Sequence, residues 1–139
     1  MARNNQFSIA VHIMAVLGFY KGDEICSSSL ARSVNANPSF VRRILSKLSK
    51  ANLVHTSLGK GGHCALAKAA KDITLFDIYK AVEAPSAFAI HSYPIQKSCT
   101  ISCAIKPFME KVLTKTQRSL EQTLKDVSLA ETVSKMRTI

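Results

Sequence analysis

Apolar residues recur every three or four positions over several stretches of the chain, and this spacing predicts a mainly helical fold. The first such stretch stops at Gly22, and its apolar positions are Phe7, Val11, Met14 and Leu17. It follows an arginine, as a signal peptide would, but His12 interrupts it, no small-x-small cleavage site follows, and it is too short to span a bilayer. We therefore expect a core helix, with His12 as a hydrogen-bonded core residue rather than a ligand.

Two helices joined by a tight turn are predicted next. The segment SSLARSV predicts a short helix capped by Ser27 or Ser28, because a serine oxygen accepts hydrogen bonds from the free amides of a first turn. Asn37 and Pro38 predict the start of the following helix, since proline needs no amide proton at that position. Helix, turn and helix in this order form a helix-turn-helix unit, whose second helix enters the major groove of DNA.

The helix that begins at Pro38 has an apolar face and a basic face. Its inward positions are Val41, Ile44, Leu45 and Leu48. Its outward positions, without an acidic neighbour, are Ser39, Arg42, Arg43, Ser46, Lys47 and Lys50, and all of these but Lys50 are expected to face the groove. Such a face suits base edges in the major groove, whereas the alternative is a solvated basic surface, which is the commoner role of a run of charges.

A glycine-rich hairpin is predicted between Leu53 and Leu66, where β-prone residues flank a turn. The turn residues are Gly59, Lys60, Gly61 and Gly62. Glycines supply the positive φ that a tight hairpin requires. A hairpin directly after a recognition helix is a wing, whose tip reaches the minor groove or phosphates through Lys60, His55 or His63.

Charge points to a polyanionic partner. The 139 residues suffice for one domain with a working core, and 19 Lys and Arg against 9 Asp and Glu give a formal net charge of +10. Self-repulsion at this charge disfavours compactness unless an anionic partner takes up part of it. Because the chain from Ile25 to Lys71 contains no Asp or Glu, nucleic acid is the first candidate for that partner.

The remaining chain predicts a further core helix, a linker and one long helix. Thr74 and Asp77 fit a capping box at the start of TLFDIYKAVE. The long helix runs from about Ile105 to Val127, and its apolar seam is Ile105, Met109, Val112, Thr116, Leu120, Leu124 and Val127. We expect this seam to join two chains, since a twofold axis would place two recognition helices about 34 Å apart, one turn of DNA.

The chain resembles the Rrf-type winged helix-turn-helix regulators, which include the IscR, NsrR and CymR groups. The resemblance covers about Ser27 to Glu83 and rests on SSSLARSVNANPSFVRRILSKLSKANLV and GKGGHCALAKAAKDITLFDIYKAVE. The runs SVNANPSFVRR and FAIHSYPIQKSC are most similar to the YwnA-like branch, which lacks an iron–sulfur cluster. The resemblance implies a homodimeric, sequence-specific DNA-binding transcription regulator, a repressor that recognises a partly palindromic operator.

The resemblance also assigns roles to individual residues. It gives recognition-helix roles to Ser39, Phe40, Arg42 and Arg43, and wing roles to Gly59, Lys60, Gly61 and Gly62. The chain departs from the family pattern at two places. Leu58 replaces an arginine that is common in relatives, and we expect Lys60 to substitute for its charge. His63 and Cys64 replace a Gly-Tyr pair. The predicted DNA-binding residues are Ser28, Ser39, Phe40, Arg42, Arg43, Ser46, Lys47, Gly59, Lys60, Gly61, Gly62 and His63.

We expect three parts along the chain. Residues 1–84 form the winged helix-turn-helix domain, with the first helix packed against it. Residues 85–103 form a linker that contains a cysteine pair, and residues 104–139 form the dimerisation helix and a C-terminal tail. The fold class is therefore mainly α with a small β wing.

Four cysteines are too few for the disulfide framework of a small secreted domain, which indicates a reducing cytoplasm. Cys103 lies near the predicted start of the long helix and Cys99 one turn ahead, where a helix N-terminus favours a thiolate. The two interpretations are a thiol switch at Cys99 and Cys103, with Cys26 as a cross-chain partner, and two small apolar residues that fill the linker. We expect Cys64 in the wing to be structural.

We expect no cofactor and no enzymatic activity. Cluster-binding relatives have three cysteines in this linker, this chain has two, and an iron–sulfur cluster normally takes four protein ligands. The alternative is a cluster or a zinc site that takes an additional ligand from His91, Cys26 or Cys64. No catalytic spacing or phosphate-binding motif is present. Two alternative functions stay open. One is an iron–sulfur-sensing regulator of the same fold, and the other is a winged-helix module that binds RNA or protein without reading sequence. We expect no membrane partner.

Overall fold

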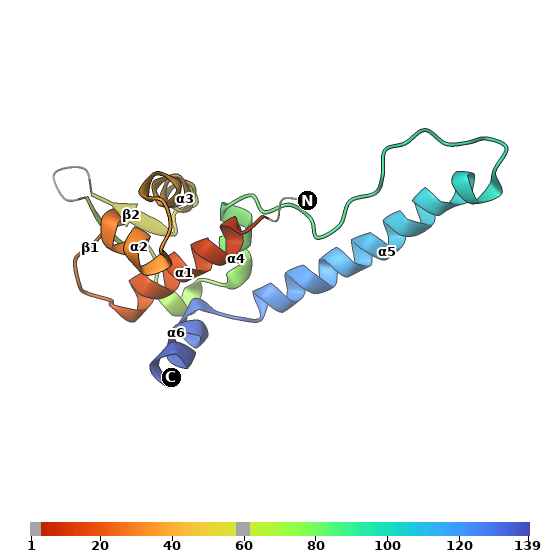
Figure 1. The fold of residues 1–139 in the computed structure, drawn as a ribbon. Helices are drawn as coiled ribbons and strands as arrows, with labels where there is room; N and C mark the ends of the chain where they lie inside the picture. The colour runs from red at the N-terminus through yellow and green to blue at the C-terminus, as the bar shows by residue number, and fades with distance from the viewer. Residues whose placement is uncertain (1–3, 58–61) are drawn as a thin grey trace. The chain divides into compact units, whose positions relative to one another are not determined.

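The computed structural model describes residues 4–57 and 62–139, which divide into two compact units. The first unit contains the described residues up to Ala84 together with Leu124–Ile139, and the second is Pro85–Thr123. The helices are α1 (Gln6–Phe19), α2 (Ser27–Val34), α3 (Pro38–Lys50), η1 (Ala70–Asp72), α4 (Leu75–Ala81), α5 (Thr100–Lys125) and α6 (Leu129–Arg137), as Figure 1 shows. The strands are β1 (Ile25–Cys26), β2 (Val54–Thr56) and β3 (His63–Leu66). A mainly helical fold with a small wing is confirmed.

Helix α1 forms the centre of the first unit, where it contacts α2, α3, α4, α6 and β3. Its buried residues are Ala10, Ile13, Met14 and Leu17. The prediction was correct for Met14 and Leu17, whereas Phe7 and Val11 are only half-buried. His12 is exposed rather than part of the core, but the hydrogen bond expected of it is present, because its Nε2 lies 3.0 Å from the Ser33 hydroxyl. Since α1 is apolar on nearly every side, the sequence pattern did not specify which side faces the core.

In the helix-turn-helix, the cap of the first helix differs from the prediction, whereas the turn and the start of the second helix agree with it. The N-cap of α2 is Cys26 and makes no capping hydrogen bond, so the prediction of a capping serine was wrong. Asn35 ends α2 in the left-handed region, with φ of 62°. Asn37 caps α3 by accepting a hydrogen bond from the Ser39 amide at 2.8 Å, and Pro38 occupies the first helical position, as predicted.

The wing is the antiparallel pair of β2 and β3, which confirms the predicted hairpin. Thr56 pairs with Cys64, and Val54 pairs with Leu66. The two-residue strand β1 completes a sheet of order β1-β3-β2, with Ile25 opposite Cys64. Strand β1 was not predicted, because two residues carry no periodicity.

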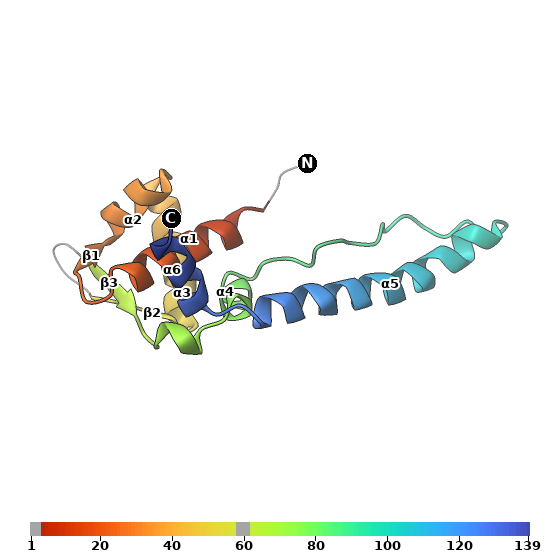
Figure 2. The same ribbon diagram turned by 90° about the horizontal axis from the view of Figure 1, so that it is seen from below.

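The end of the chain returns to the first unit. Thr74 and Asp77 form the predicted capping box, with N–H···O distances of 2.9 and 3.1 Å. The predicted C-terminal tail contains helix α6, which lies beside α1 (Figures 1 and 2) and buries Leu129 and Val133. The contact is close at Gly18, where an added Cβ would lie 2.8 Å from Val133 Cγ2.

The second unit consists of the extended segment after Ala84 and most of α5. Helix α5 begins at Thr100, earlier than the predicted Ile105, so that Pro107 lies inside the helix. A helix that started at Ile105 would have had this proline in its first turn, where proline is best tolerated. Along the predicted seam, Val112 and Thr116 are exposed and the other residues are half-buried in one chain, so the pairing of this seam with a second chain stays a prediction. Within the described ranges, no helix is long and apolar enough to cross a membrane.

Candidate nucleic-acid interface

Helix α3 separates a buried face from a basic exposed face. The four predicted inward residues are at most 4% exposed and join the core: Val41, Ile44, Leu45 and Leu48. The side chains of Ser39, Arg42, Arg43 and Ser46 are exposed, as is that of Lys50 at the end of the helix. The apolar face fixes the rotation of α3 about its axis, and this rotation leaves the basic residues in solvent.

Arg42, Arg43 and Lys47 each contact a different neighbouring residue. Arg42 donates a hydrogen bond from Nη2 to the Ser39 hydroxyl at 3.4 Å. The Arg43 guanidinium lies 5.4 Å from the ring centroid of Phe40, which is half-buried against the core. Lys47 is half-buried and donates from Nζ to the Gln6 side-chain oxygen at 3.0 Å, so it joins α3 to the start of α1. Arg42 and Arg43 therefore remain the most available of the predicted base-reading side chains.

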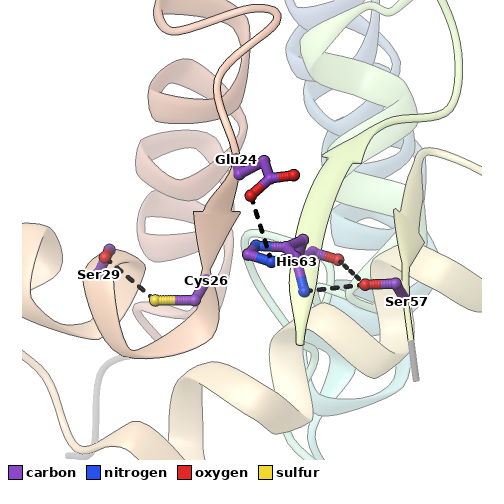
Figure 3. Close-up of polar contacts among 5 residues, drawn as sticks. All are labelled: Glu24, Cys26, Ser29, Ser57 and His63. Atoms are coloured by element: carbon purple, nitrogen blue, oxygen red, sulfur yellow. Dashed lines mark hydrogen bonds and ion pairs between the residues drawn. The ribbon is translucent and has the colours of Figure 1, made fainter. Parts of the chain in front are cut away.

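The wing carries His63 at the start of β3. Its Nε2 lies 3.6 Å from the Glu24 carboxylate (Figure 3), and its backbone amide donates to the Ser57 hydroxyl at 3.0 Å. The fold thus brings an acid next to the wing, although Glu24 lies outside the acid-free block of the sequence. Gly62 precedes β3.

The predicted wing-tip residues lie outside the described residues, so their roles stay predictions. They are Leu58, Gly59, Lys60 and Gly61.

Cys26 stands at the N-terminus of α2 and is half-exposed. Its sulfur lies 2.9 Å from the Ser28 hydroxyl and 3.2 Å from the Ser29 hydroxyl, the contact drawn in Figure 3. Hydrogen bonds from Ser28 and then Ser29 lower the pKa of the Cys26 thiol from an ordinary 9.0 to about 6. Cys26 is therefore mainly a thiolate at neutral pH, which is the nucleophilic form of cysteine.

Cys64 has the opposite environment. It is 4% exposed and is part of the core, opposite Ile25 on one side and Thr56 on the other. Burial raises the pKa of the Cys64 thiol, and the nearby Cys26 raises it further. Cys64 is one of the two residues that replace the Gly-Tyr pair of related regulators. Its burial as a neutral thiol in the core explains how a cysteine is accommodated there.

Cys99 and Cys103 are free and exposed in the second unit. Cys103 lies in the first turn of α5, and its sulfur is 3.7 Å from the Lys97 carbonyl oxygen. Cys99 directly precedes the helix and accepts a hydrogen bond from the Ser102 amide at 3.5 Å. Neither sulfur has hydroxyl contacts like those of Cys26 among the hydrogen bonds formed by the described residues.

Three side chains beyond the predicted set contribute to this surface: Glu24, Ser29 and Lys50. The run of serines after Cys26 was a signal for Ser29, because i+2 and i+3 positions of a helix start lie near its cap. Lys50 lay on the predicted basic face but was not among the predicted DNA-binding residues. Glu24 had no local signal, since its partner His63 is distant in sequence.

Known proteins match nearly the whole chain. The family model Rrf2, described as an iron-dependent transcriptional regulator, matches residues 3–135. The chain is 33% identical over 133 residues to YwnA of Bacillus subtilis (strain 168), a proposed HTH-type transcriptional regulator, covering 94% of this chain and 96% of YwnA. A proposed transcriptional regulator from Lactobacillus plantarum superposes with a TM-score of 0.82 at 25% identity, over 96% of this chain and 90% of that one. CymR (YrzC), the global cysteine regulator of B. subtilis, superposes with a TM-score of 0.72 at 19% identity, over 96% and 97%.

The donor side chains do not fit an iron site. Within residues 4–57 and 62–139, no group of three or more His, Cys, Asp or Glu side chains could hold a metal ion. Cys26 and Cys64 belong to the first unit, and Cys99 and Cys103 belong to the second. An iron–sulfur cluster normally takes four protein ligands, and neither unit by itself contains more than two cysteines.

Proposed function

The chain belongs to the Rrf2 family of transcriptional regulators, and we propose that it acts as a homodimeric repressor that binds a partly palindromic DNA operator. The family and its relatives are regulators of transcription rather than enzymes. The observation that carries the proposal is the exposed, acid-free face of α3, where Arg42 and Arg43 stand over a fully buried opposite face. This role places the protein in the cytoplasm with the genes that it controls.

In this proposal α3 lies in the major groove. Arg42 and Arg43 read base edges, since an arginine can donate two hydrogen bonds to one guanine. Ser39 and Ser46 contact base edges or phosphates from the same face, and Ser28 contacts the backbone from the start of α2. The wing contributes through Gly62, His63 and the predicted tip residues. Residues 1–84 together with α6 form the DNA-binding part.

Dimerisation is assigned to α5. This helix has 26 residues, none of them buried in one chain. Ile101, Phe108 and Val112 are 68%, 62% and 40% exposed, and their spacing places them on one side of the helix. An apolar stripe of this kind is stable in water only when covered, and a second copy of the same helix offers the matching surface.

Redox control is assigned to Cys26 in preference to Cys99 and Cys103, because its hydroxyl contacts favour the thiolate. The thiolate attacks a hydroperoxide: an S–O bond forms, the O–O bond breaks, and an alcohol or water leaves after proton uptake. A second thiol then condenses with the sulfenic acid, forms a disulfide and releases water. The added group would stand at the start of α2, which crosses the DNA backbone in a helix-turn-helix, and would weaken binding.

Selection of bound duplexes from random DNA tests the base-reading proposal. We expect one preferred, partly palindromic sequence, and Arg42→Ala or Arg43→Ala should each cost about 1–3 kcal/mol on it while binding to random DNA changes less. Lys71→Ala, which removes an exposed charge from η1, is the control and should preserve the preference. Equal losses on selected and random duplexes would show that these arginines do not read bases.

A further inference from the structure

We propose that the cleft between α3 and the β2–β3 hairpin is a phosphate-binding site in which Lys50 supplies the main charge. The proposal rests on the proposed DNA-binding function and adds a ligand group and residues to it. The cleft has a volume of about 370 Å³. Its polar lining comes from three elements and includes Ser27, Arg42, Ser46, Ser49, Lys50 and Thr56.

The chemistry of this lining suits a phosphate group. Among the lining residues that the structure describes, Arg42 and Lys50 are cations, none is acidic, and the other polar side chains carry hydroxyl groups, apart from the Cys64 thiol. Ammonium, guanidinium and hydroxyl donors are the groups that proteins use for phosphate oxygens. Ser27, the first residue of α2, also lines the cleft, so the start of that helix borders it.

The donors are available. The hydrogen bonds and ion pairs formed among residues 4–57 and 62–139 do not use the side chains of Ser46, Ser49 or Lys50. Lys47, one turn earlier, is by contrast held by Gln6. Arg42 makes one long hydrogen bond to Ser39 and retains further N–H donors for a ligand.

Nothing in the lining opposes an anion strongly. The carbonyl end of α3 is partly negative, but Lys50 is its last residue and offsets that potential. Cys64 also lines the cleft, and burial raises the pKa of its thiol, so it stays uncharged at neutral pH. The described lining residues are therefore positive or neutral, whereas the Cys26 thiolate, close enough to raise the pKa of Cys64, opposes an anion from outside the lining.

Two sources can supply the phosphate: the DNA backbone beside the groove that α3 enters, or a free phosphorylated small molecule. Arg42 lines the cleft and is also a proposed base-reading residue. A backbone phosphate would hold Arg42 in place for the adjacent base. A free phosphate compound would instead compete with DNA for the same side chain.

The first experiment measures binding of Lys50→Ala and Lys50→Arg to the selected duplex and to a random duplex over a range of salt concentrations. For a backbone phosphate, we expect Lys50→Ala to weaken both duplexes by the same factor, about fivefold, and to lower the salt slope by about 1 per lost contact. Lys50→Arg should restore most of the affinity, whereas Lys71→Ala serves as the charge-matched control. Lys50 is exposed, so an unchanged melting temperature is expected for each variant.

The second experiment titrates the protein with inorganic phosphate at constant ionic strength and follows backbone amide NMR shifts, with chloride as the reference anion. Binding in the cleft should shift the amides of Ser27, Lys50 and Thr56, and Lys50→Ala should abolish the shifts. If Lys50→Ala weakens DNA binding but inorganic phosphate does not compete with DNA, the cleft is assigned to the DNA backbone. If inorganic phosphate competes with DNA, the cleft is assigned to free phosphate compounds. The site is rejected if Lys50→Ala matches Lys71→Ala on both duplexes and phosphate shifts no more amides than chloride.

These results separate this site from the proposed function. A loss of base preference in Arg43→Ala tests the reading of sequence and does not involve Lys50. If no preferred duplex exists but phosphate still binds with the expected amide shifts, the proposed function fails and the phosphate site stands.

Discussion

The sulfur of Cys26 lies 2.9 Å from the hydroxyl oxygen of Ser28, two residues further along the chain. This contact, together with that of Ser29, gives Cys26 the lowered pKa that separates it from Cys64. Two of the four cysteines, Cys26 and Cys64, therefore differ in chemistry. The difference arises at the start of α2, on the surface assigned to DNA.

The pH dependence of Cys26 alkylation follows from this contact. Only the thiolate reacts, so the rate with iodoacetamide should rise with pH, pass its midpoint near pH 6 and then level off. Ser28→Ala removes the largest cause of the lowered pKa and should move the midpoint upward. Mass spectrometry of the Cys26 peptide measures the rate. A midpoint near 9.0 in the unaltered protein would contradict the assignment.

Oxidation should lower the affinity for the selected operator through Cys26. After hydroperoxide and a low-molecular-weight thiol, we expect roughly a tenfold loss, about 1.4 kcal/mol, because a bulky group stands at the start of α2. Cys26→Ser should remove the response, and the double variant Cys99→Ser, Cys103→Ser should retain it. Fluorescence anisotropy before and after treatment with a reductant measures the change. Loss of the response in the double variant would assign sensing to α5 instead.

Gly18→Ala should destabilise the protein although alanine favours helix. The new Cβ would lie 2.8 Å from Val133 Cγ2, and a β-branched valine cannot easily turn away. Overpacking costs about 1–3 kcal/mol, whereas alanine in place of glycine gains about 1 kcal/mol, so we expect a small net loss in the free energy of unfolding. Urea denaturation measures it. In a Val133→Ala background the same change should become stabilising, and a loss of similar size there would exclude this contact as the cause.

Phe108→Glu should convert a dimer into monomers without unfolding the chain. Phe108 is 62% exposed in one chain, so a charge there costs the monomer little but cannot be covered by a second α5. Thr114→Glu adds the same charge at another exposed position of α5 and is the control. Analytical ultracentrifugation gives the oligomeric state. A dimer that survives Phe108→Glu would place the interface elsewhere.

Several features were predictable because their causes are local. The capping box of Thr74 and Asp77 and the Asn37 cap each involve residues within three positions. The inward face of α3 followed from a clear separation of apolar and basic residues. In α1 the pattern was weaker, because apolar residues cover nearly the whole helix, and the predicted core face was only partly correct.

The sequence by itself determined the order of elements from α1 through the hairpin to α4 and α5, the caps at Asn37 and Thr74, and the basic face of α3, since spacing and side-chain chemistry within a few residues specify each of these. Only the tertiary structure decided which distant groups meet: Glu24 with His63, Lys47 with Gln6, and Val133 with Gly18. It also decided that Cys64 is buried while Cys26 remains half-exposed. The physical reason is that burial and charge at a site depend on packing between elements, and a local pattern specifies a face but not the neighbour that covers it.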